Sequence, residues 1–591
     1  MTAATRPTTV PPTGGFVLPA PIPRDLPAVD RVAEAFRRIA AADRPEVWIT
    51  LRGEIDVRAD AAAVDARVAG GESLPLAGLL VAVKDNIDVA GLPTTAGCPE
   101  FAHTPGVTAT SVRRLQDAGA VVMGKTNLDQ FATGLVGTRS PYGAVRCAWD
   151  PELVSGGSSA GSGAAVGLGL VDLALGTDTA GSGRVPAAFH GIVGLKASLG
   201  LVSTAGVLPA CADYDAVTVF AADLPTARAA LGVMIGPDPA DPRSRTWPAD
   251  VVLGVPPVPV LAVPRTEDLA ALTDDYRDAF DRTVARVRET GCTVVELDVS
   301  TMLDAARLLY DGAIVAERYS AVGAFLDGAP AGADPVVAGI IGRSRDVSGP
   351  AFADDLDTLA VARAAAHTVL AGVDGLLLPT TTEHPSIAAV QADPLAINRR
   401  MGTYTNFANL LDMAAMAVPG APTRTGAPFG VMVVVPAFAD QVALDLAALV
   451  TGDDPGPAVP TGGLELAVFG AHLPGQPLND SLFHLGARYL GPARTTDAYR
   501  LVDLDTTPPK PGLVRHDPGV GAPIVGERYL LSPAALGTLL AGLSAPMSLT
   551  PVELDDGRWV TGFGCAFHAA QQGTDITGHG GWAAYRSSLT D

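Results

Sequence analysis

Residues 154–188 read VSGGSSAGSGAAVGLGLVDLALGTDTAGSGRVPAA and place two clusters of serine and glycine on either side of the apolar run 164–175. A flexible linker is the alternative interpretation, but a linker does not enclose a run of core residues. Glycine permits close backbone approach and positive φ, and successive N–H groups in such turns form a concavity that binds anions. A serine there lies beside donors that can stabilise an oxyanion. The stretch therefore predicts a catalytic turn within a folded core.

A candidate proton acceptor, Lys84, comes earlier in the chain. There are four lysines, Lys84, Lys125, Lys196 and Lys510, and every other basic residue is an arginine. Lys84 lies in the strand-like segment LLVAVKDNIDV (79–89), and burial lowers the pKa of an ammonium group so that neutral amine becomes accessible near pH 7. A structural salt bridge is the alternative role. In a chain that otherwise uses arginine, a core lysine favours a function that needs a deprotonated amine.

Two further motif matches are not expected to be functional. Residues 119–126, GAVVMGKT, match the P-loop pattern, but the residues between the glycines read as a strand instead of a phosphate-binding turn. Residues 157–161, GSSAG, match the nucleophile-elbow pattern GxSxG, but Pro, Asp and Glu interrupt the segment before them, where a strand is required. None of the nine histidines shows the local arrangement of a serine-activating base, including His190 shortly after Ser182. We therefore expect neither nucleotide binding nor a Ser-His mechanism.

Composition excludes several classes of protein. The chain has 591 residues and a formal net charge of −22, which argues against binding of nucleic acid or docking on anionic lipid. Its five cysteines are widely spaced without a CxxC pair, so we expect neither a disulfide framework nor a structural zinc site. The N-terminus lacks a secretory pattern, and the least polar stretch, 161–180, contains two aspartates and many glycines. These features predict a soluble, cytoplasmic protein.

The pattern of hydrophobic residues predicts the fold class. Short apolar runs alternate with helical patterns and turns over about 76–208 and again over 276–297, and 375–381 and 430–436 are further candidates for buried strands. Such alternation predicts an α/β fold with helices covering a largely buried sheet. Residues 1–27 are rich in Pro and Thr and are expected to be flexible, and residues 28–450 are expected to form the first domain. TGDDPGPAVPTGG (451–463) reads as a linker, and 464–591 as a smaller α+β domain.

Three separated motifs, VAVKDN at 81–86, GGSSAGSGAA at 156–165 and GTDTAGSGRVPAA at 176–188, resemble the amidase signature family over about residues 30–450. The resemblance implies a large mixed sheet covered by helices and a Ser-Ser-Lys serine hydrolase that needs no metal or organic cofactor. It implies Ser182 as the nucleophile, Ser158 after a cis peptide bond as the bridging serine, and Lys84 as the general base. The oxyanion hole would then be formed by the loop amides of Thr179, Ala180, Gly181 and Ser182. The family has two glycines where this chain has Ala180-Gly181, a departure that should leave the amides in place.

The segment RLLYDGAIVAERY (307–319) is similar to the substrate helix of allophanate hydrolases, with Tyr310 and Arg318 at matching places. On one continuous helix these two residues lie about 80° apart around the axis and reach one pocket. Arginine offers a bidentate fork to a carboxylate, and allophanate is urea that carries a carboxylate on one nitrogen. An exposed helix in which Arg318 pairs with a neighbouring acid fits the spacing equally well.

The C-terminal region resembles the C-terminal domain of allophanate hydrolases, beginning with VFGAHLPGQPLN (468–479). Part of it also resembles the γ-glutamylcyclotransferase-like fold, but LLAGLSAPMSL (539–549), where that fold's catalytic glutamate should follow, contains no acid. Cyclotransferase activity is therefore not expected. The resemblance implies that His472 assists decarboxylation of N-carboxycarbamate, the first product, whereas a structural turn residue is the alternative.

The resemblance as a whole implies an amidohydrolase that converts allophanate to ammonia and carbon dioxide through N-carboxycarbamate. It also implies a homodimer, as is usual among relatives. Because the chain has no biotin-type MKM sequence, a urea carboxylase partner is expected to be a separate polypeptide. Two alternatives stay open, a general amidase or glutaminase subunit of a tRNA-dependent amidotransferase, and a non-catalytic scaffold.

Overall fold

The computed structural model describes residues 16–460 and 462–589, which divide into two compact units. The first unit combines the chain up to Thr246 with Val260–Gly456, and the second combines Trp247–Pro259 with the chain from Pro457 onward. The sequence predicts that 28–450 forms the first domain without interruption. The structure differs, because it assigns Trp247–Pro259, which lies within that range, to the second unit. Backbone hydrogen bonds hold it in the second unit, including one from Leu253 N to Gly486 O at 2.9 Å. Such a tertiary contact leaves no mark on local composition.

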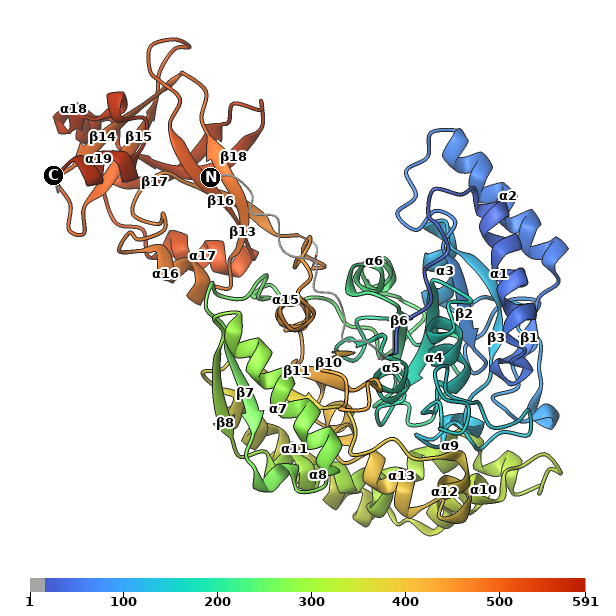
Figure 1. The fold of residues 1–591 in the computed structure, drawn as a ribbon. Coiled ribbons are helices and arrows are strands. Elements are labelled where there is room, and N and C mark those ends of the chain that lie inside the picture. The colour runs from blue at the N-terminus through green and yellow to red at the C-terminus, as the bar shows by residue number, and fades with distance from the viewer. Residues whose placement is uncertain (1–15, 461, 590–591) are drawn as a thin grey trace. The chain divides into compact units, whose positions relative to one another are not determined.

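The first unit is built around an 11-stranded sheet (Figure 1). In spatial order its strands are β1 (Trp48–Leu51), β3 (Val121–Thr126), β2 (Leu80–Lys84), β4 (Leu173–Asp178), β6 (Ala216–Ala221), β5 (Val193–Lys196), β10 (Met413–Pro419), β11 (Gly430–Pro436), β9 (Gly375–Pro379), β7 (Val260–Pro264) and β8 (Thr293–Leu297). Strands β3, β2 and β4 run parallel, as do β9, β7 and β8, while the neighbours between β4 and β9 pair antiparallel. The predicted large mixed sheet is confirmed.

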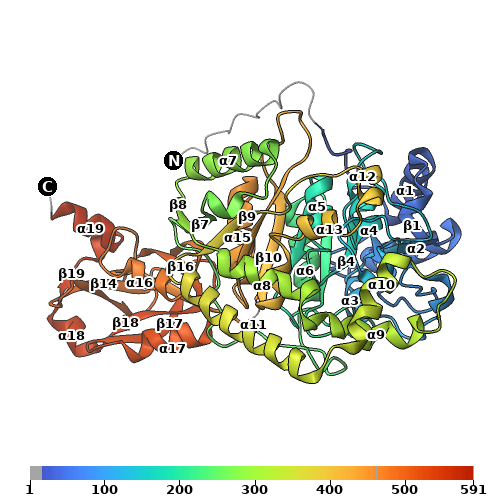
Figure 2. The ribbon, with the colours of Figure 1, turned by 90° about the horizontal axis from the view of Figure 1, so that it is seen from below.

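Helices pack around this sheet (Figures 1 and 2). They are α1 (Ala28–Ala42), α2 (Glu54–Ala69), α3 (Thr110–Asp117), α4 (Ala160–Gly167), α5 (Val185–His190), α6 (Leu224–Met234), α7 (Asp274–Glu289), α8 (Ser300–Asp311), α9 (Ala316–Leu326), α10 (Pro335–Arg343), α11 (Gly349–Leu370), α12 (Ile387–Ala392), α13 (Ala396–Met401), α14 (Asn406–Leu410) and α15 (Asp440–Thr451). Central strands such as β4 and β6 are buried along their whole length, so both faces of the sheet are covered. The predicted α/β class is therefore confirmed.

The predicted flexible N-terminus needs a correction. Of residues 1–27, the first fifteen lie outside the described residues. In the remainder, Ile22 is 2% exposed, and its carbonyl oxygen accepts a hydrogen bond from Arg31 Nη1 at 2.9 Å. Phe16 N also donates to Gly426 O at 3.1 Å. Within residues 16–27, Arg31 of α1 therefore holds the carbonyl groups of Ile22 and Pro23, and Gly426 holds Phe16.

The second unit has its own two sheets and its own hydrophobic core. One sheet contains, in spatial order, β13 (Arg488–Arg494), β16 (Val525–Leu531), β12 (Leu464–Val468), β18 (Trp559–Cys565) and β17 (Met547–Glu553). The other contains β15 (Lys510–Arg515), β14 (Tyr499–Leu504) and β19 (Thr574–Asp575). The helices are α16 (Asn479–His484), α17 (Pro533–Ala541), α18 (Phe567–Gln572) and α19 (Trp582–Ser588). A smaller unit of mixed helices and strands agrees with the predicted α+β class.

Candidate active site

The predicted triad residues come from neighbouring elements of the first unit. Lys84 is the last residue of β2, Ser158 lies just before α4, and Ser182 lies in the turn between β4 and α5. Because β2 pairs in parallel with β4, the carboxyl ends of both strands meet at the same edge of the sheet. Lys84 and Ser158 are fully buried, and Ser182 is 2% exposed. The parallel strands β2 and β4 thus place Lys84 and the turn of Ser182 at the same buried edge of the sheet.

Lys84 contacts Ser158 directly. Its Nζ lies 2.8 Å from Ser158 Oγ and 2.7 Å from Thr177 Oγ1. The Gly157–Ser158 peptide bond is cis, as the resemblance implied. No hydrogen bond joins Ser158 to Ser182 among the residues that the structure describes. Because hydrogen bonds of catalytic groups are often long before substrate binds, the second link of the relay stays a prediction.

Burial controls the protonation of Lys84. It lowers the pKa of the amine to about 7, and nearby acids, Asp129 foremost, oppose this effect incompletely. Within residues 16–460 and 462–589, no carboxylate forms an ion pair with Lys84. By contrast, Lys125 Nζ lies 3.0 Å from Asp85 Oδ1 in a fully buried ion pair. Lys125 therefore forms the structural salt bridge, while Lys84 has the environment of a general base.

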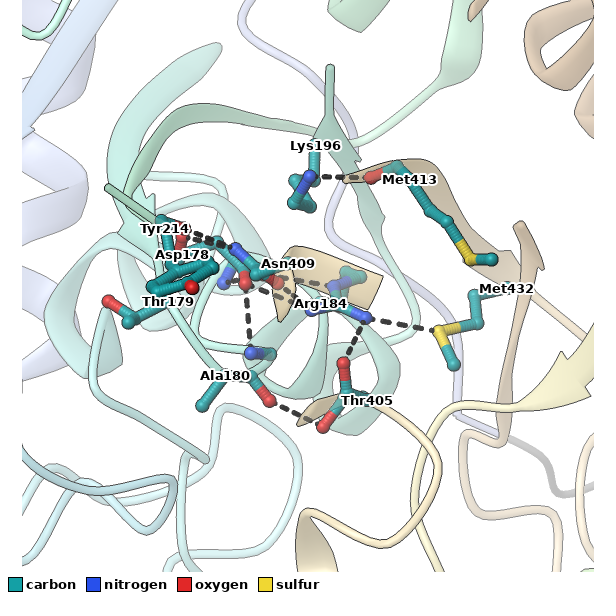
Figure 3. A network of polar contacts seen from close by, with 12 residues as sticks. Asp178, Thr179, Ala180, Arg184, Lys196, Tyr214, Thr405, Asn409, Met413 and Met432 are labelled. Atoms are coloured by element: carbon teal, nitrogen blue, oxygen red, sulfur yellow. Dashed lines mark hydrogen bonds and ion pairs between the residues drawn. The ribbon is translucent and has the colours of Figure 1, made fainter. Parts of the chain in front are cut away.

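Hydrogen bonds to the Asp178 carboxylate hold the turn that carries Ser182 (Figure 3). Asp178, the last residue of β4, accepts hydrogen bonds from Gly181 N at 2.8 Å and Gly183 N at 2.9 Å, and pairs with Arg184 Nη2 at 2.9 Å. Burial alone would raise the pKa of Asp178, but the charge and hydrogen bonds of Arg184, together with the charge of Lys196 and the Gly183 N–H, outweigh burial and lower it. The turn is therefore a fixed structure built on a buried ion pair, and the linker interpretation is wrong.

The structure corrects one of the four predicted oxyanion-hole donors. The Gly181 N–H already donates to Asp178 Oδ1, so it is removed from the set. The amides of Thr179, Ala180 and Ser182 make no hydrogen bond within the described part of the chain. Unpaired amides in a turn of this kind are the donors that can stabilise a developing oxyanion. These three amides remain the candidates.

Tyr310 and Arg318 meet, but not on one continuous helix as predicted. Helix α8 ends at Asp311 and α9 begins at Ala316, with a 3-10 turn over Ala313–Val315 between them. The break has a local cause, because the Gly312 backbone is extended and the next amide donates to Asp355. The Arg318 guanidinium carbon nevertheless lies 5.4 Å from the centre of the Tyr310 ring. The two side chains therefore share one environment despite the broken helix.

Arg318 is a buried cation with unused hydrogen-bond donors. It is 1% exposed, and Nη1 donates to Thr133 Oγ1 at 3.0 Å, while Nε and Nη2 have no partner among the described residues. The alternative of an exposed helix with Arg318 paired to an acid is wrong. Arg318 is also one of the charges that lower the pKa of Lys84. A buried arginine with free donors near the base is suited to bind an anionic group of a substrate.

Residues 30–444, which contain the Lys84–Ser158 contact and the Ser182 turn, match the family model described as Amidase. The chain belongs to the amidase family. Residues 464–587 match a second family, described as the allophanate hydrolase C-terminal domain. Both matches agree with the two sequence resemblances.

Individual members of the amidase family match different shares of the chain. Urea amidolyases from Lachancea kluyveri and Saccharomyces cerevisiae are each 40% identical, over 92% and 88% of this chain. The chain spans about 30% of the length of these curated relatives, at 31% and 30%. The structure of Kluyveromyces lactis allophanate hydrolase is 37% identical with a TM-score of 0.84, covering 95% of this chain and 97% of that chain. A glutamyl-tRNA(Gln) amidotransferase component from Deinococcus deserti is 37% identical over 47% of this chain and 57% of its own length.

The second unit of this amidase family member contains a cavity of about 290 Å³ at the predicted histidine. His472 follows β12, and its ring stacks on Phe563 with the ring centres 4.7 Å apart. Burial, and then the charge of Lys510, lowers the pKa of His472 to about 4, so this histidine is neutral at pH 7. Lys510 lines the same cavity. A neutral histidine and a lysine in one cavity favour a binding site over a purely structural turn residue.

Two polar residues that contact the catalytic turn were missed by the sequence analysis (Figure 3). Thr405, just before α14, donates from Oγ1 to Ala180 O at 2.6 Å. Asn409 donates from Nδ2 to Asp178 O at 2.7 Å. The first pair is 225 residues apart in the chain and the second 231, and no local pattern singles out either residue. They could be recognised only from their place in the fold.

The described residues contain neither a candidate metal site nor a candidate membrane span. Across 16–460 and 462–589, no group of three His, Cys, Asp or Glu side chains could hold a metal ion. No helix of the described chain combines the length and the apolar character needed to cross a bilayer. In the first unit, Arg318 and the unpaired turn amides are the described groups suited to hold an anion.

Proposed function

We propose that this chain is an allophanate hydrolase. The observation that carries the proposal is Arg318, which is buried, has two unpaired nitrogens and affects the pKa of Lys84. A simple amide offers nothing to neutralise such a cation. The carboxylate of allophanate can accept two parallel hydrogen bonds from the guanidinium fork and thereby orient the adjacent urea carbonyl. Similarity over nearly the whole chain to the Kluyveromyces lactis allophanate hydrolase supports this assignment.

In the proposed mechanism, neutral Lys84 accepts a proton from Ser182 through Ser158 while Ser182 Oγ attacks the urea carbonyl carbon. Unpaired amides of the turn stabilise the negative charge that develops on the carbonyl oxygen. The bond to the terminal nitrogen then breaks, and the proton returns along the same path to the departing ammonia. A water molecule, deprotonated by the same base, attacks the acyl-enzyme. N-carboxycarbamate leaves and Ser182 is regenerated.

We further propose that the cavity of the second unit acts on N-carboxycarbamate. Loss of carbon dioxide from this dianion leaves a pair of electrons on nitrogen, which takes up a proton and yields carbamate. Carbamate then breaks down to the second ammonia and the second carbon dioxide. Lys510 supplies positive charge for the dianion, and neutral His472 has one N–H that can orient a carboxylate. The stacking of His472 on Phe563 fixes the ring plane for such a role.

A substrate comparison tests the proposal. Purified full-length chain is assayed for ammonia release from allophanate, glutamine and simple aliphatic amides, and allophanate is expected to have the highest kcat/KM. Preference for glutamine would support a glutaminase subunit of an amidotransferase, and preference for simple amides a general amidase. A protein that hydrolyses none of them and does not react with a fluorophosphonate probe would be a non-catalytic scaffold.

A homodimeric state, implied by the resemblance, and a cytoplasmic location and a separate urea carboxylase, expected from the sequence, remain predictions. Light scattering on the purified protein measures the oligomeric state. The His472 role is tested separately, because a His472→Asn variant should release the first ammonia at the normal rate while N-carboxycarbamate accumulates. Unchanged kinetics of both ammonia molecules in that variant would exclude it.

A further inference from the structure

The peptide unit between Ala180 and Gly181, directly before Ser182, is held at both ends. The Ala180 carbonyl oxygen accepts a hydrogen bond from Thr405 Oγ1 at 2.6 Å. The Gly181 N–H donates to Asp178 Oδ1 at 2.8 Å. Because a peptide unit is planar, this one cannot rotate without breaking both hydrogen bonds. Its orientation is therefore fixed by one residue of the turn and one distant residue.

The neighbouring peptide units are anchored through their carbonyl groups in the same way. Asp178 O accepts from Asn409 Nδ2 at 2.7 Å, and Gly181 O accepts from the backbone N–H groups of Arg184 and Val185, both at 2.8 Å. In a trans peptide the C=O and the following N–H point in opposite directions. Holding these carbonyl groups therefore directs the amides of the following residues, Thr179 and Ser182, to the opposite side.

Thr405 is itself held rigidly. It is fully buried, and its carbonyl oxygen accepts from Arg184 Nη1 at 3.0 Å. The second branch of the same guanidinium, Nη2, donates to Asn409 Oδ1 at 2.9 Å. The buried Asp178–Arg184 pair thus ties the catalytic turn to both Thr405 and Asn409 (Figure 3).

The packing leaves the turn no room to adjust. Gly181 has φ +127°, and a Cβ atom built on it would lie 2.5 Å from Thr405 Oγ1. Glycine is therefore required there, both for its backbone conformation and for its contact with Thr405. A turn this closely packed can hold its amides in place before the reaction begins.

We infer that Thr405 is a positioning residue whose hydroxyl fixes the Ala180–Gly181 peptide unit, so that the unpaired amides of the turn face the developing charge. The inference rests on the proposed role of Ser182 as nucleophile. Without the hydroxyl, the peptide unit keeps only its Gly181–Asp178 anchor, so the amides of the turn are held less precisely. Donors that are held less precisely lose more of their interaction with a charged oxyanion than with a neutral carbonyl, so the loss falls on the transition state.

The test compares Thr405→Val, which removes the hydroxyl at similar volume, with Thr405→Ser, which retains it. Thr405→Val should lower kcat on allophanate by about 10- to 100-fold with KM nearly unchanged, because the interaction acts in the transition state. Thr405→Ser should keep kcat within about threefold of wild type. Thr403→Val is the matched control, since the Thr403 hydroxyl donates to Arg400 O at 2.7 Å and does not contact the turn.

Four outcomes would overturn the inference: an unchanged kcat in Thr405→Val, a loss confined to KM, equal losses in the valine and serine variants, or an equal loss in the Thr403→Val control. If Thr405→Val does not fold, Thr405→Ala replaces it in the same comparison with serine. Failure of the proposed function has a different signature, because wild type would then not hydrolyse allophanate or Ser182→Ala would retain activity.

Reaction of each variant with a fluorophosphonate probe adds an independent readout. Its phosphoryl oxygen occupies the oxyanion site, so the valine variant should react more slowly and the serine variant normally.

Discussion

Lys84 Nζ and Ser158 Oγ lie 2.8 Å apart in a region from which both side chains expose nothing to solvent. On the adjacent strand, Lys125 is equally buried but pairs with Asp85. The two lysines therefore differ in the availability of a carboxylate. The one without a paired acid can lose its proton near neutral pH, which is the property that a general base requires.

The pH dependence of activity should report Lys84. Because burial lowers its pKa to about 7 and the neutral amine is the active form, kcat/KM should rise with pH and level off above about pH 7. Lys84→Arg should be nearly inactive over the same range, since guanidinium stays protonated. Initial rates of ammonia release, followed from mildly acidic to alkaline pH, measure both. A flat profile for wild type, or a fully active Lys84→Arg variant, would remove Lys84 from the mechanism.

The burial of Lys84 also predicts that its contribution to the free energy of unfolding depends on pH. Lys84 has a pKa of about 7 in the folded protein and an ordinary value of 10.5 when exposed, so between these values the unfolded chain binds more protons. The contribution of Lys84 to the free energy of unfolding therefore increases as pH rises from about 7 to 10.5. Lys84→Met lacks this dependence. The difference in free energy of unfolding between Lys84→Met and wild type, measured by urea denaturation, should be highest near neutral pH and fall as the solution becomes alkaline. A difference that stays constant with pH would contradict the lowered pKa.

Ser182→Ala should reduce ammonia release from allophanate by at least about 10³-fold, because removing a nucleophile leaves only the contribution of binding and oxyanion stabilisation. The melting temperature should change little, since Ser182 Oγ makes no hydrogen bond among the described residues. The matched control is Ser203→Ala, which removes another buried hydroxyl, one bonded to Asp238 at 2.6 Å. Labelling by a fluorophosphonate probe should persist in the control and disappear in Ser182→Ala. Labelling of Ser182→Ala would place the nucleophile elsewhere.

The candidate site residues that stand out in the sequence are those whose chemistry is visible locally. Lys84 stands out as a rare lysine in a core strand, and the Ser158 and Ser182 clusters stand out by their glycine. Contacts between distant segments leave no such trace. Thr405 reaches the turn across 225 residues, and its neighbourhood in the sequence has the composition of an ordinary loop and helix.

Two errors have physical causes of another kind. Helical spacing predicts one continuous helix through 307–319, but the extended backbone of Gly312 ends α8 at Asp311, directly after Tyr310. The family resemblance implies that the Gly181 amide belongs to the oxyanion hole, but the motif does not show that Asp178, earlier in the same turn, already accepts its hydrogen bond. Periodicity and motifs report the order of residues along the chain. The end of α8 and the partner of the Gly181 N–H depend instead on which hydrogen-bond acceptor is nearest in space.

Arg318→Lys should raise KM for allophanate by about tenfold or more, with a smaller change in kcat, because an ammonium group retains the charge but not the bidentate fork. The rate of reaction with a fluorophosphonate probe, which carries no carboxylate, should stay near that of wild type. Arg307→Met is the control, because Arg307 lies on α8 with its side chain 74% exposed and should leave KM unchanged. An unchanged KM in Arg318→Lys would mean that the substrate carboxylate is bound by another group.

Lys125→Met should lower the stability of the protein and leave kcat nearly unchanged, which would distinguish Lys125 from Lys84. Removing Lys125 leaves the Asp85 carboxylate buried without its partner at 3.0 Å, and an uncompensated buried charge costs about 3–5 kcal/mol of stability. Because the Lys125 ammonium is bonded to Pro93, Thr94 and Asp85, and not to Ser158 or Ser182, among the described residues, the fraction that remains folded should hydrolyse allophanate with a nearly normal kcat. Denaturation curves and rates normalised to active-site titration measure the two effects. A Lys125→Met/Asp85→Asn double variant should recover part of the lost stability, since it removes both members of the pair. Loss of kcat without loss of stability in Lys125→Met would instead give this lysine a place in the reaction.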